Sequence, residues 1–127
     1  MNLKLKVWDK LNSQMFKVLQ ITFDRMGLPY LKVGVIADDD KGNRFNLAIE
    51  NVEILQYIGE KDKIGEEIYY GDILQTNEAD WIGRVIFNFG GFILIDKHGG
   101  FSIEPEWRHC VILGNIYQNY ELFKGGK

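Results

Sequence analysis

The residues best suited to metal binding or nucleophilic catalysis are His98, His109 and Cys110, the two histidines and the one cysteine of the chain. Neighbouring residues of a strand point to opposite faces of a sheet, so His109 and Cys110 cannot easily bind one tetrahedral ion. Three ligands also leave a structural zinc site one ligand short. Cys110 heads an apolar stretch, where an inert buried thiol is the usual state. We therefore expect no zinc site, no other cofactor and no cysteine-dependent catalysis.

A second group of potential ligands is the acidic run 38–40, which lies close to Gly42 and Asn43. An EF-hand calcium loop that starts at residue 38 requires glycine at its sixth position and glutamate at its twelfth, but Asn43 and Ile49 stand there. Asp-Lys-Gly suits a type I turn followed by a glycine in the left-handed region. We predict a solvated hairpin tip and no calcium site.

Carboxylates that could serve acid–base catalysis cluster at Glu66, Glu67 and Asp72. Such catalysis requires one cleft that holds two carboxyl groups at different pKa values. A charged, solvated loop explains the cluster equally well. The glycine pairs at 90–91 and 99–100 are not phosphate loops, because neither is followed by Lys-Ser/Thr at a helix start. No convincing catalytic set emerges, and we expect a protein that is not an enzyme.

The composition is that of a folded chain with an ordinary surface. Its 127 residues suit one domain, or a small barrel with an extension, and 46% hydrophobic and 13% aromatic residues argue against disorder. The formal net charge of −3 gives no long-range field that attracts nucleic acid. One cysteine fits a reducing compartment. The start of the chain does not resemble a signal peptide, and no apolar window approaches membrane-spanning length, so we expect a cytoplasmic protein with no membrane partner.

Alternating apolar and polar residues predict strands in the first part of the chain. Residues 3–8 alternate strictly, and residues 15–23 predict a second strand that forms a hairpin with them, although a helix over 15–23 is the open alternative. Residues 31–37 and 44–49 predict a second hairpin, closed by the acidic turn.

After a strand over 52–58, residues 68–116 predict about five further short strands between Gly-rich turns. This spacing suits a small, strongly bent barrel better than a sandwich. The expected elements are a strand over 52–58, a tight reversal at 62–65, strands over 71–75, 82–89 and 92–96 with a hairpin at Gly90-Gly91, a short strand over 101–103, a helical turn at 105–109, a last strand over 110–116 and a mixed tail. The fold class is mainly β. Residues 1–55 are expected to form a β-rich extension and residues 56–127 the barrel, together one compact unit.

Three segments resemble the YopX family of phage and prophage proteins. The run 57–73, Y-I-G-E-K-D-K-I-G-E-E-I-Y-Y-G-D-I, resembles the family signature Q-Y-x-G-x-K-D-K-x-G-x-E-I-Y-x-G-D-I. Residues 6–10 resemble the opening F-R-A-W-D-K, and residues 113–119 resemble the closing I-G-N-I-Y-E-N. Ile64 stands where the family usually has asparagine, which predicts a less regular turn, and Tyr120 replaces a proline. The resemblance implies an SH3-like roll and a phage or prophage origin, without an assigned activity.

We interpret the signature residues as scaffolding. Glycines there adopt backbone angles closed to other residues, Asp72 accepts hydrogen bonds from nearby amides, and the tyrosines anchor the core. The non-enzymatic interpretation depends on these side chains not lining an open, polar hollow. The signature positions concerned are Tyr57, Gly59, Lys61, Asp62, Lys63, Gly65, Glu67, Ile68, Tyr69, Gly71 and Asp72.

A candidate binding surface consists of Tyr69, Tyr70, Trp81 and Arg84, which cluster around the first barrel strands. Aromatic rings beside a cation can stack on single-stranded nucleic acid or hold a peptide. Aromatic residues fill cores more often, so closing the barrel ends is the simpler role. The leading hypothesis is a non-catalytic protein-binding or assembly module that forms homo-oligomers and binds a phage or host protein. The alternative is a regulator that binds single-stranded nucleic acid through the barrel face.

Overall fold

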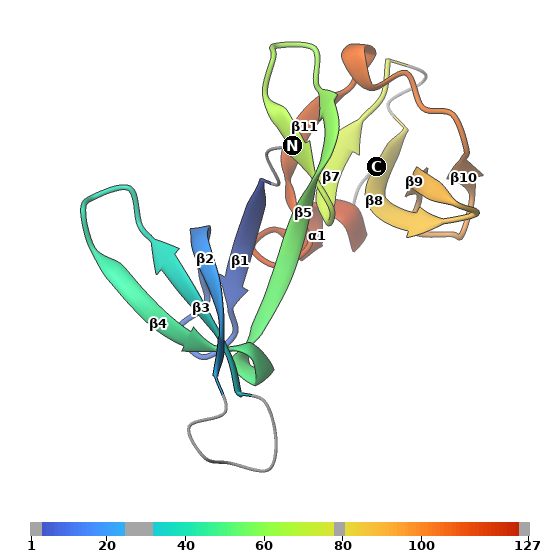
Figure 1. The fold of residues 1–127 in the computed structure, drawn as a ribbon. Helices are drawn as coiled ribbons and strands as arrows, with labels where there is room; N and C mark the ends of the chain where they lie inside the picture. The colour runs from blue at the N-terminus through green and yellow to red at the C-terminus, as the bar shows by residue number, and fades with distance from the viewer. Residues whose placement is uncertain (1–3, 25–31, 78–80, 125–127) are drawn as a thin grey trace. The chain divides into compact units, whose positions relative to one another are not determined.

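The computed structural model describes residues 4–24, 32–77 and 81–124 (Figure 1). Within these ranges the fold is mainly β, with antiparallel sheets, two 3-10 turns and one short α-helix, which confirms the predicted fold class. The chain divides into two compact units, Met1–Gln56 and Tyr57–Lys127. Strand β5 (Val52–Lys61) runs through the boundary, so its two halves belong to different units.

The first unit is an antiparallel sheet in the order β4-β3-β2-β1-β5. Both predicted hairpins are present, and the strand at residues 14–24 rules out the helical alternative. Cross-strand pairing joins Val7 to Phe16 on one side and to Ile54 on the other. The elements are β1 (Leu5–Asp9), β2 (Gln14–Asp24), β3 (Lys32–Asp38), β4 (Arg44–Ala48) and the 3-10 turn η1 (Ile49–Asn51).

Apolar side chains that alternate along these strands form the core of the first unit. The buried members of this core are Val7, Phe16, Val35, Ala37 and Val52. Because side chains alternate between the two faces of a strand, the strict pattern in residues 5–9 places Val7 in the core.

Asp9 ends β1 and forms the turn of the first hairpin. Its Oδ1 accepts the amide N–H of Leu11 at 3.1 Å and that of Asn12 at 3.3 Å, and its Oδ2 accepts Nδ2 of Asn12 at 2.8 Å. The carboxylate is buried and its bonds are local, as in an Asx turn. The Trp-Asp-Lys segment at residues 8–10 therefore contributes a hairpin turn.

The second unit contains a five-stranded antiparallel sheet in the order β10-β9-β8-β7-β11, and a short pairing of β6 with the second half of β5 (Figure 1). The sheet is open, since β10 and β11 are its edges and no pairing joins them within the described residues. The elements are β6 (Glu67–Tyr69), β7 (Asp72–Gln75), β8 (Ile82–Asn88), β9 (Gly91–Ile95), β10 (Phe101–Ser102), η2 (Trp107–His109), β11 (Val111–Asn115) and α1 (Tyr120–Lys124).

The open sheet differs from the expected closed barrel for a local reason. Strand β10 has only two residues, and the chain after it turns through Pro105 into η2. Proline has no backbone N–H to donate to a ladder, so the chain cannot extend β10 regularly through this position.

One buried cluster of the second unit packs on the face of the sheet that carries Leu74, Val85 and Leu94. Its buried members are Ile68, Leu74, Val85, Leu94 and Cys110, with both Trp81 and Trp107 packed against them. On β9, the adjacent residues Ile93 and Leu94 are both buried, so this strand is covered on both faces.

The β8–β9 hairpin turns one residue earlier than predicted. Asn88 pairs with Gly91, so the two-residue loop is Phe89-Gly90 and not Gly90-Gly91. Both loop residues have positive φ, +54° at Phe89 and +80° at Gly90, as a type I′ turn requires. Gly91 belongs to β9.

Candidate functional site

The signature run contains a turn that is organised by Asp62, which is buried. Its Oδ1 accepts the amide N–H of Ile64 at 3.0 Å and that of Glu66 at 2.8 Å. Its Oδ2 accepts the amide of Ile112 in β11 at 3.2 Å. The amide of Gly65 donates to the carbonyl oxygen of Asp62 at 3.1 Å, so the turn is regular although Ile64 replaces the usual asparagine. The Asp62 carboxylate is occupied by backbone amides and is not a free base.

A second fixed point of the signature is the corner at Gly71 and Asp72. Oδ2 of Asp72 accepts the amide of Tyr69 at 2.8 Å, which is the pinning role predicted for this residue. The amide of Gly71 donates to the carbonyl oxygen of Val85 at 3.0 Å. The carbonyl oxygen of Gly71 accepts the amide of Ile116 at 2.9 Å. A Cβ at Gly71 would lie 3.0 Å from the ring of Tyr117, and its φ is +89°. The backbone here therefore requires glycine.

The rings of Tyr57 and Tyr69 lie against each other, with centroids 5.7 Å apart. Burial, together with the neighbouring Glu67 carboxylate, raises the pKa of Tyr69 to about 12. Its hydroxyl stays protonated at neutral pH and is bonded to Glu67. Glu67 and Asp72 therefore both lie near a neutral, buried phenol, whereas Glu66 is exposed. These three carboxylates line neither of the two hollows described below.

Beside the Asp62 turn, the second unit has an open hollow of about 430 Å³. Two signature cations, Lys61 and Lys63, line it, and Arg108 from η2 faces it from a distant part of the sequence. Signature residues thus line an open, charged hollow, so the condition set above for the non-enzymatic interpretation is not met, and that interpretation can no longer rest on the signature. The remaining lining residues of the hollow are Tyr57, Gly59, Glu60, Asp62 and Gly65.

A wider hollow of about 640 Å³ lies near Cys110, with Trp81 and Phe101 in its lining. Burial, followed by the negative charges of Asp62 and Glu106, raises the pKa of the Cys110 thiol to about 11. Its Sγ donates to the carbonyl oxygen of Glu106 at 3.4 Å. The thiol is thus protonated at neutral pH, the state expected of an inert cysteine.

The residues considered as metal ligands in the sequence do not converge. Nδ1 of His109 lies 2.8 Å from the Glu106 carboxylate on the surface, while His98 occupies the turn between β9 and β10. In residues 4–24, 32–77 and 81–124, no three His, Cys, Asp or Glu side chains are placed to share a metal ion.

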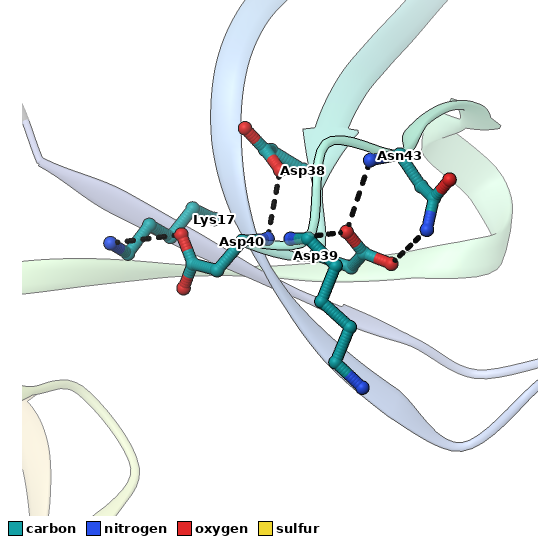
Figure 2. Close-up of polar contacts among 6 residues, drawn as sticks. Lys17, Asp38, Asp39, Asp40 and Asn43 are labelled. Carbon is teal, nitrogen blue, oxygen red and sulfur yellow. Dashed lines mark hydrogen bonds and ion pairs between the residues drawn. The ribbon is translucent and has the colours of Figure 1, made fainter.

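The acidic run 38–40 forms a hairpin tip, as predicted (Figure 2). Oδ1 of Asp39 accepts the amides of Lys41 at 2.8 Å and Asn43 at 3.2 Å, and Oδ2 accepts Nδ2 of Asn43 at 2.8 Å. The bond from the Asn43 side chain, followed by that from the Lys41 amide, lowers the pKa of Asp39. Nζ of Lys17 lies 3.2 Å from Asp40. These carboxylates are used within the turn and by a neighbouring lysine.

The predicted surface of Tyr69, Tyr70, Trp81 and Arg84 is not one surface. The Trp81 ring packs on the core face, where a Cβ at Gly83 would lie 2.8 Å from it. Arg84 lies on the other face of β8, because it is an odd number of residues away, and its Cζ lies 5.5 Å above the Phe123 ring. Tyr69 is buried and Tyr70 is half-buried.

Trp81 is held in place by a polar contact as well. Its Nε1 donates to Oδ2 of Asp96 at 2.9 Å. Burial alone would raise the pKa of Asp96, but the bonds from Trp81 and from the amides of Gly100 and His98 outweigh it and lower that pKa. The indole is therefore engaged in the fold.

Sequence reasoning did not identify the most exposed aromatic cluster of the second unit, at the end of the β8–β9 hairpin. Phe87 and Phe92 pair across the strands with ring centroids 5.1 Å apart, and Phe89 lies 5.4 Å from Phe101. Phe87 is 60%, Phe89 65% and Phe101 52% exposed. Phe87 and Phe92 share the core face of the sheet with Val85 and Leu94, whereas Phe101 pairs with Ile95 on the other face, so we call only the exposed pair Phe89–Phe101 the aromatic tip. The signal in the sequence was Phe-Asn-Phe-Gly-Gly-Phe, whose rings stand directly beside a turn.

None of the helices within the described ranges has the length and apolar character needed to cross a membrane.

The comparisons with known proteins give this chain a fold and a family. A comparison with curated proteins finds no match. Among solved structures, the fold is similar to the crystal structure of protein EF1440 from Enterococcus faecalis, with a TM-score of 0.62 and 20% identity, over 97% of this chain and 99% of that one. It is also similar to the X-ray structure of protein yopX from Bacillus subtilis, with a TM-score of 0.59 and 21% identity, over 100% of both chains. The sequence model of the YopX protein family matches residues 4–124, and the chain therefore belongs to the YopX family.

Proposed function

We propose that this chain is a non-catalytic protein-binding or assembly module of phage or prophage origin, which acts in the bacterial cytoplasm as a homo-oligomer. The observation that carries this function is the aromatic tip. Clustered, exposed aromatic rings on a small domain mark interaction surfaces, since aromatic residues are enriched in the buried centres of interfaces.

Phe89 supports an interaction surface most directly. A bulky residue at φ +54° is strained, and type I′ turns favour asparagine, aspartate or glycine at this position. With 65% of Phe89 exposed, burial within the chain does not offset that strain. Burial of the Phe89 ring by another molecule would offset this backbone strain.

The groups that could support catalysis are engaged elsewhere in the fold. Asp62 is occupied by three amides, Tyr69 and Cys110 keep their protons at neutral pH, and Asp39 serves its own turn. Nucleophilic and acid–base mechanisms need such groups free and poised near neutral pH. Their arrangement supports a binding role.

A second copy of the chain is the partner we propose for the tip. We infer an SH3-like roll for the second unit, whose open sheet ends at the edge strand β10, and an exposed edge favours self-association. In a two-fold dimer the same patch lies on both sides, so a pair of phenylalanine rings is complementary to itself.

Light scattering coupled to gel filtration at micromolar protein concentration tests this function. We expect an oligomer that dissociates in the Phe89→Asn/Phe101→Ser variant. Leu11→Ser is the matched control, because Leu11 is an exposed apolar residue of the first unit and lies outside the tip. A monomeric wild-type chain would overturn the homo-oligomer, as would dissociation caused equally by the control.

The nucleic-acid alternative has no comparable geometric support. Trp81 and Arg84 were its stacking ring and its cation, but they lie on opposite faces of β8. A single strand cannot use both in one stacked contact of the kind found in nucleic-acid-binding barrels.

A further inference from the structure

We propose that the hollow beside the Asp62 turn binds a small phosphorylated ligand, of the size of a nucleoside phosphate. This inference does not depend on the aromatic tip, and it assigns a role to the two signature lysines that the scaffold does not use.

Three cations face the hollow from three elements: Lys61 from the end of β5, Lys63 from the turn and Arg108 from η2. Within the described residues, none of the three lies in an ion pair or a side-chain hydrogen bond. Other lysines of the chain do pair, as Lys10 does with Glu53 at 3.8 Å. Like charges that outnumber the nearby carboxylates repel one another, and an anion bound among them relieves that repulsion.

The carboxylates of the hollow do not neutralise these cations. Asp62 lines it, but three backbone amides occupy its oxygens. Glu60 is the other acidic residue in the lining. Three cations thus outnumber two carboxylates, one of which is already stabilised by N–H groups.

The backbone holds this arrangement before any ligand arrives. Between the pairs Tyr57–Tyr69 and Lys61–Glu67, β5 advances four residues while β6 advances two. The resulting bulge contains Gly59 at φ +87°, and bulges re-aim the side chains that follow them. The amide of Lys63 donates to the carbonyl oxygen of Cys110 at 2.8 Å, which fastens the turn to the chain just after η2, the element that carries Arg108. A pre-organised site loses less entropy on binding.

The shape and charge of the hollow select the ligand class. Its volume of about 430 Å³ lies within the range of small-molecule sites. Tyr57 adds an aromatic wall beside the cations, which suits a planar base joined to phosphates. A long polyanion is less suited, because duplex-binding proteins neutralise many phosphates and the net charge here is −3.

Calorimetric titration at low salt tests the inference with four probes: pyrophosphate, adenosine diphosphate, a single-stranded oligothymidylate and a glutamate-rich peptide. We expect both phosphate probes to bind, with adenosine diphosphate the tighter. Each of Lys61→Gln, Lys63→Gln and Arg108→Gln should raise the Kd about tenfold, as loss of one charge-assisted contact does. Glu60→Gln should lower the Kd, because it removes the repelling carboxylate.

Lys124→Gln is the matched control, since Lys124 is exposed at the end of α1 and does not line the hollow. Its Kd should equal that of the wild type, and amide shifts on titration should centre on residues 57–65 and 108. Thermal unfolding of each variant checks that the fold is intact, and Glu60→Gln provides a gain of affinity that damage to the fold cannot mimic.

Absence of binding by both phosphate probes would overturn the proposal. If Lys124→Gln raised the Kd as much as the other variants do, the binding would come from general surface charge and the site would be rejected. Tighter binding of the oligothymidylate or of the peptide would reject the small ligand in favour of a polymer. The oligomer test of the aromatic tip is unaffected by any of these outcomes.

Discussion

Asp62 and Asp39 organise turns of the same local design in the two units, but Asp62 is buried, whereas the hydrogen bonds of Asp39 are exposed. Each uses Oδ1 to accept the amides two and four residues further on. Each is followed after three residues by a glycine of positive φ, +88° at Gly65 and +86° at Gly42. The two turns differ in the partner of the second carboxylate oxygen, Oδ2. Oδ2 of Asp62 reaches Ile112, fifty residues away, whereas Oδ2 of Asp39 bonds the side chain of Asn43 within the same turn.

Asp96 gives a third turn of this design, intermediate between the other two. Its Oδ1 accepts the amides of His98 and Gly100, both at 2.8 Å, and its Oδ2 accepts the Trp81 indole. One local motif therefore serves three levels of integration: a surface turn, a turn that fixes one core tryptophan, and a buried turn that ties two distant segments. The position of the second oxygen, and not the turn itself, decides how much of the fold depends on each aspartate.

The largest effect is expected for Asp62→Ala. Removing this carboxylate takes away three part-buried hydrogen bonds, those from the amides of Ile64, Glu66 and Ile112, so the free energy of unfolding should fall by about 3 kcal/mol. Urea denaturation followed by circular dichroism measures the loss. Asp39→Ala is the control, because its amides face water and find new partners there. Similar losses in the two variants would show that the long-range bond of Asp62 contributes little.

Asp96→Ala should have an intermediate effect. The variant loses the hydrogen bond from the Trp81 indole. The loss should lower the free energy of unfolding by about 1 kcal/mol, because water can take the place of the carboxylate in part. A double-mutant cycle with Trp81→Phe isolates this bond in the free energy of unfolding. If the two substitutions are additive, the indole contact is not what sets Asp96 apart from Asp39.

Features of the fold that depend on neighbouring residues could be predicted from the sequence, whereas features that depend on contacts between distant residues could not. Period-2 alternation predicted the strands, and the Asp-Lys-Gly tip and the reversal at 62–65 were predicted from local turn chemistry. The same parity rule places Trp81 and Arg84 on opposite faces, but they were grouped by closeness in the sequence. The open sheet and the hollow depend on a two-residue β10 and on Arg108 arriving beside residues 61–63, and tertiary contacts decide both.

The β8–β9 turn offers a smaller test, since it shares the hairpin role of the Asp39 turn but has no aspartate to organise it. Phe89→Asn supplies a residue that type I′ turns prefer and should raise the free energy of unfolding by about 0.5 kcal/mol. Urea denaturation of the variant under monomeric conditions measures the gain. Because the same change is expected to weaken self-association, stability and assembly should move in opposite directions. A loss of stability would mean that the Phe89–Phe101 contact at 5.4 Å matters more to the isolated fold than the turn strain does.

The smallest effect concerns the exposed turn, and acid titration is the way to detect it. Asn43→Ala removes the side-chain bond that contributes most to lowering the pKa of Asp39, so this pKa should rise toward its ordinary value of 3.8. Carbon-detected NMR of the Asp39 carboxyl group follows the change, with Asp40 as an internal reference. Because the folded pKa is the lower one, the bond stabilises the wild type above the unfolded pKa, and this stabilisation fades as the pH falls through the folded value. If the pKa of Asp39 stays low in Asn43→Ala, the backbone amides of residues 41 and 43, with the Lys41 charge, are enough to keep it low. Backbone amides would then stabilise the Asp39 carboxylate, as they do at Oδ1 of Asp62.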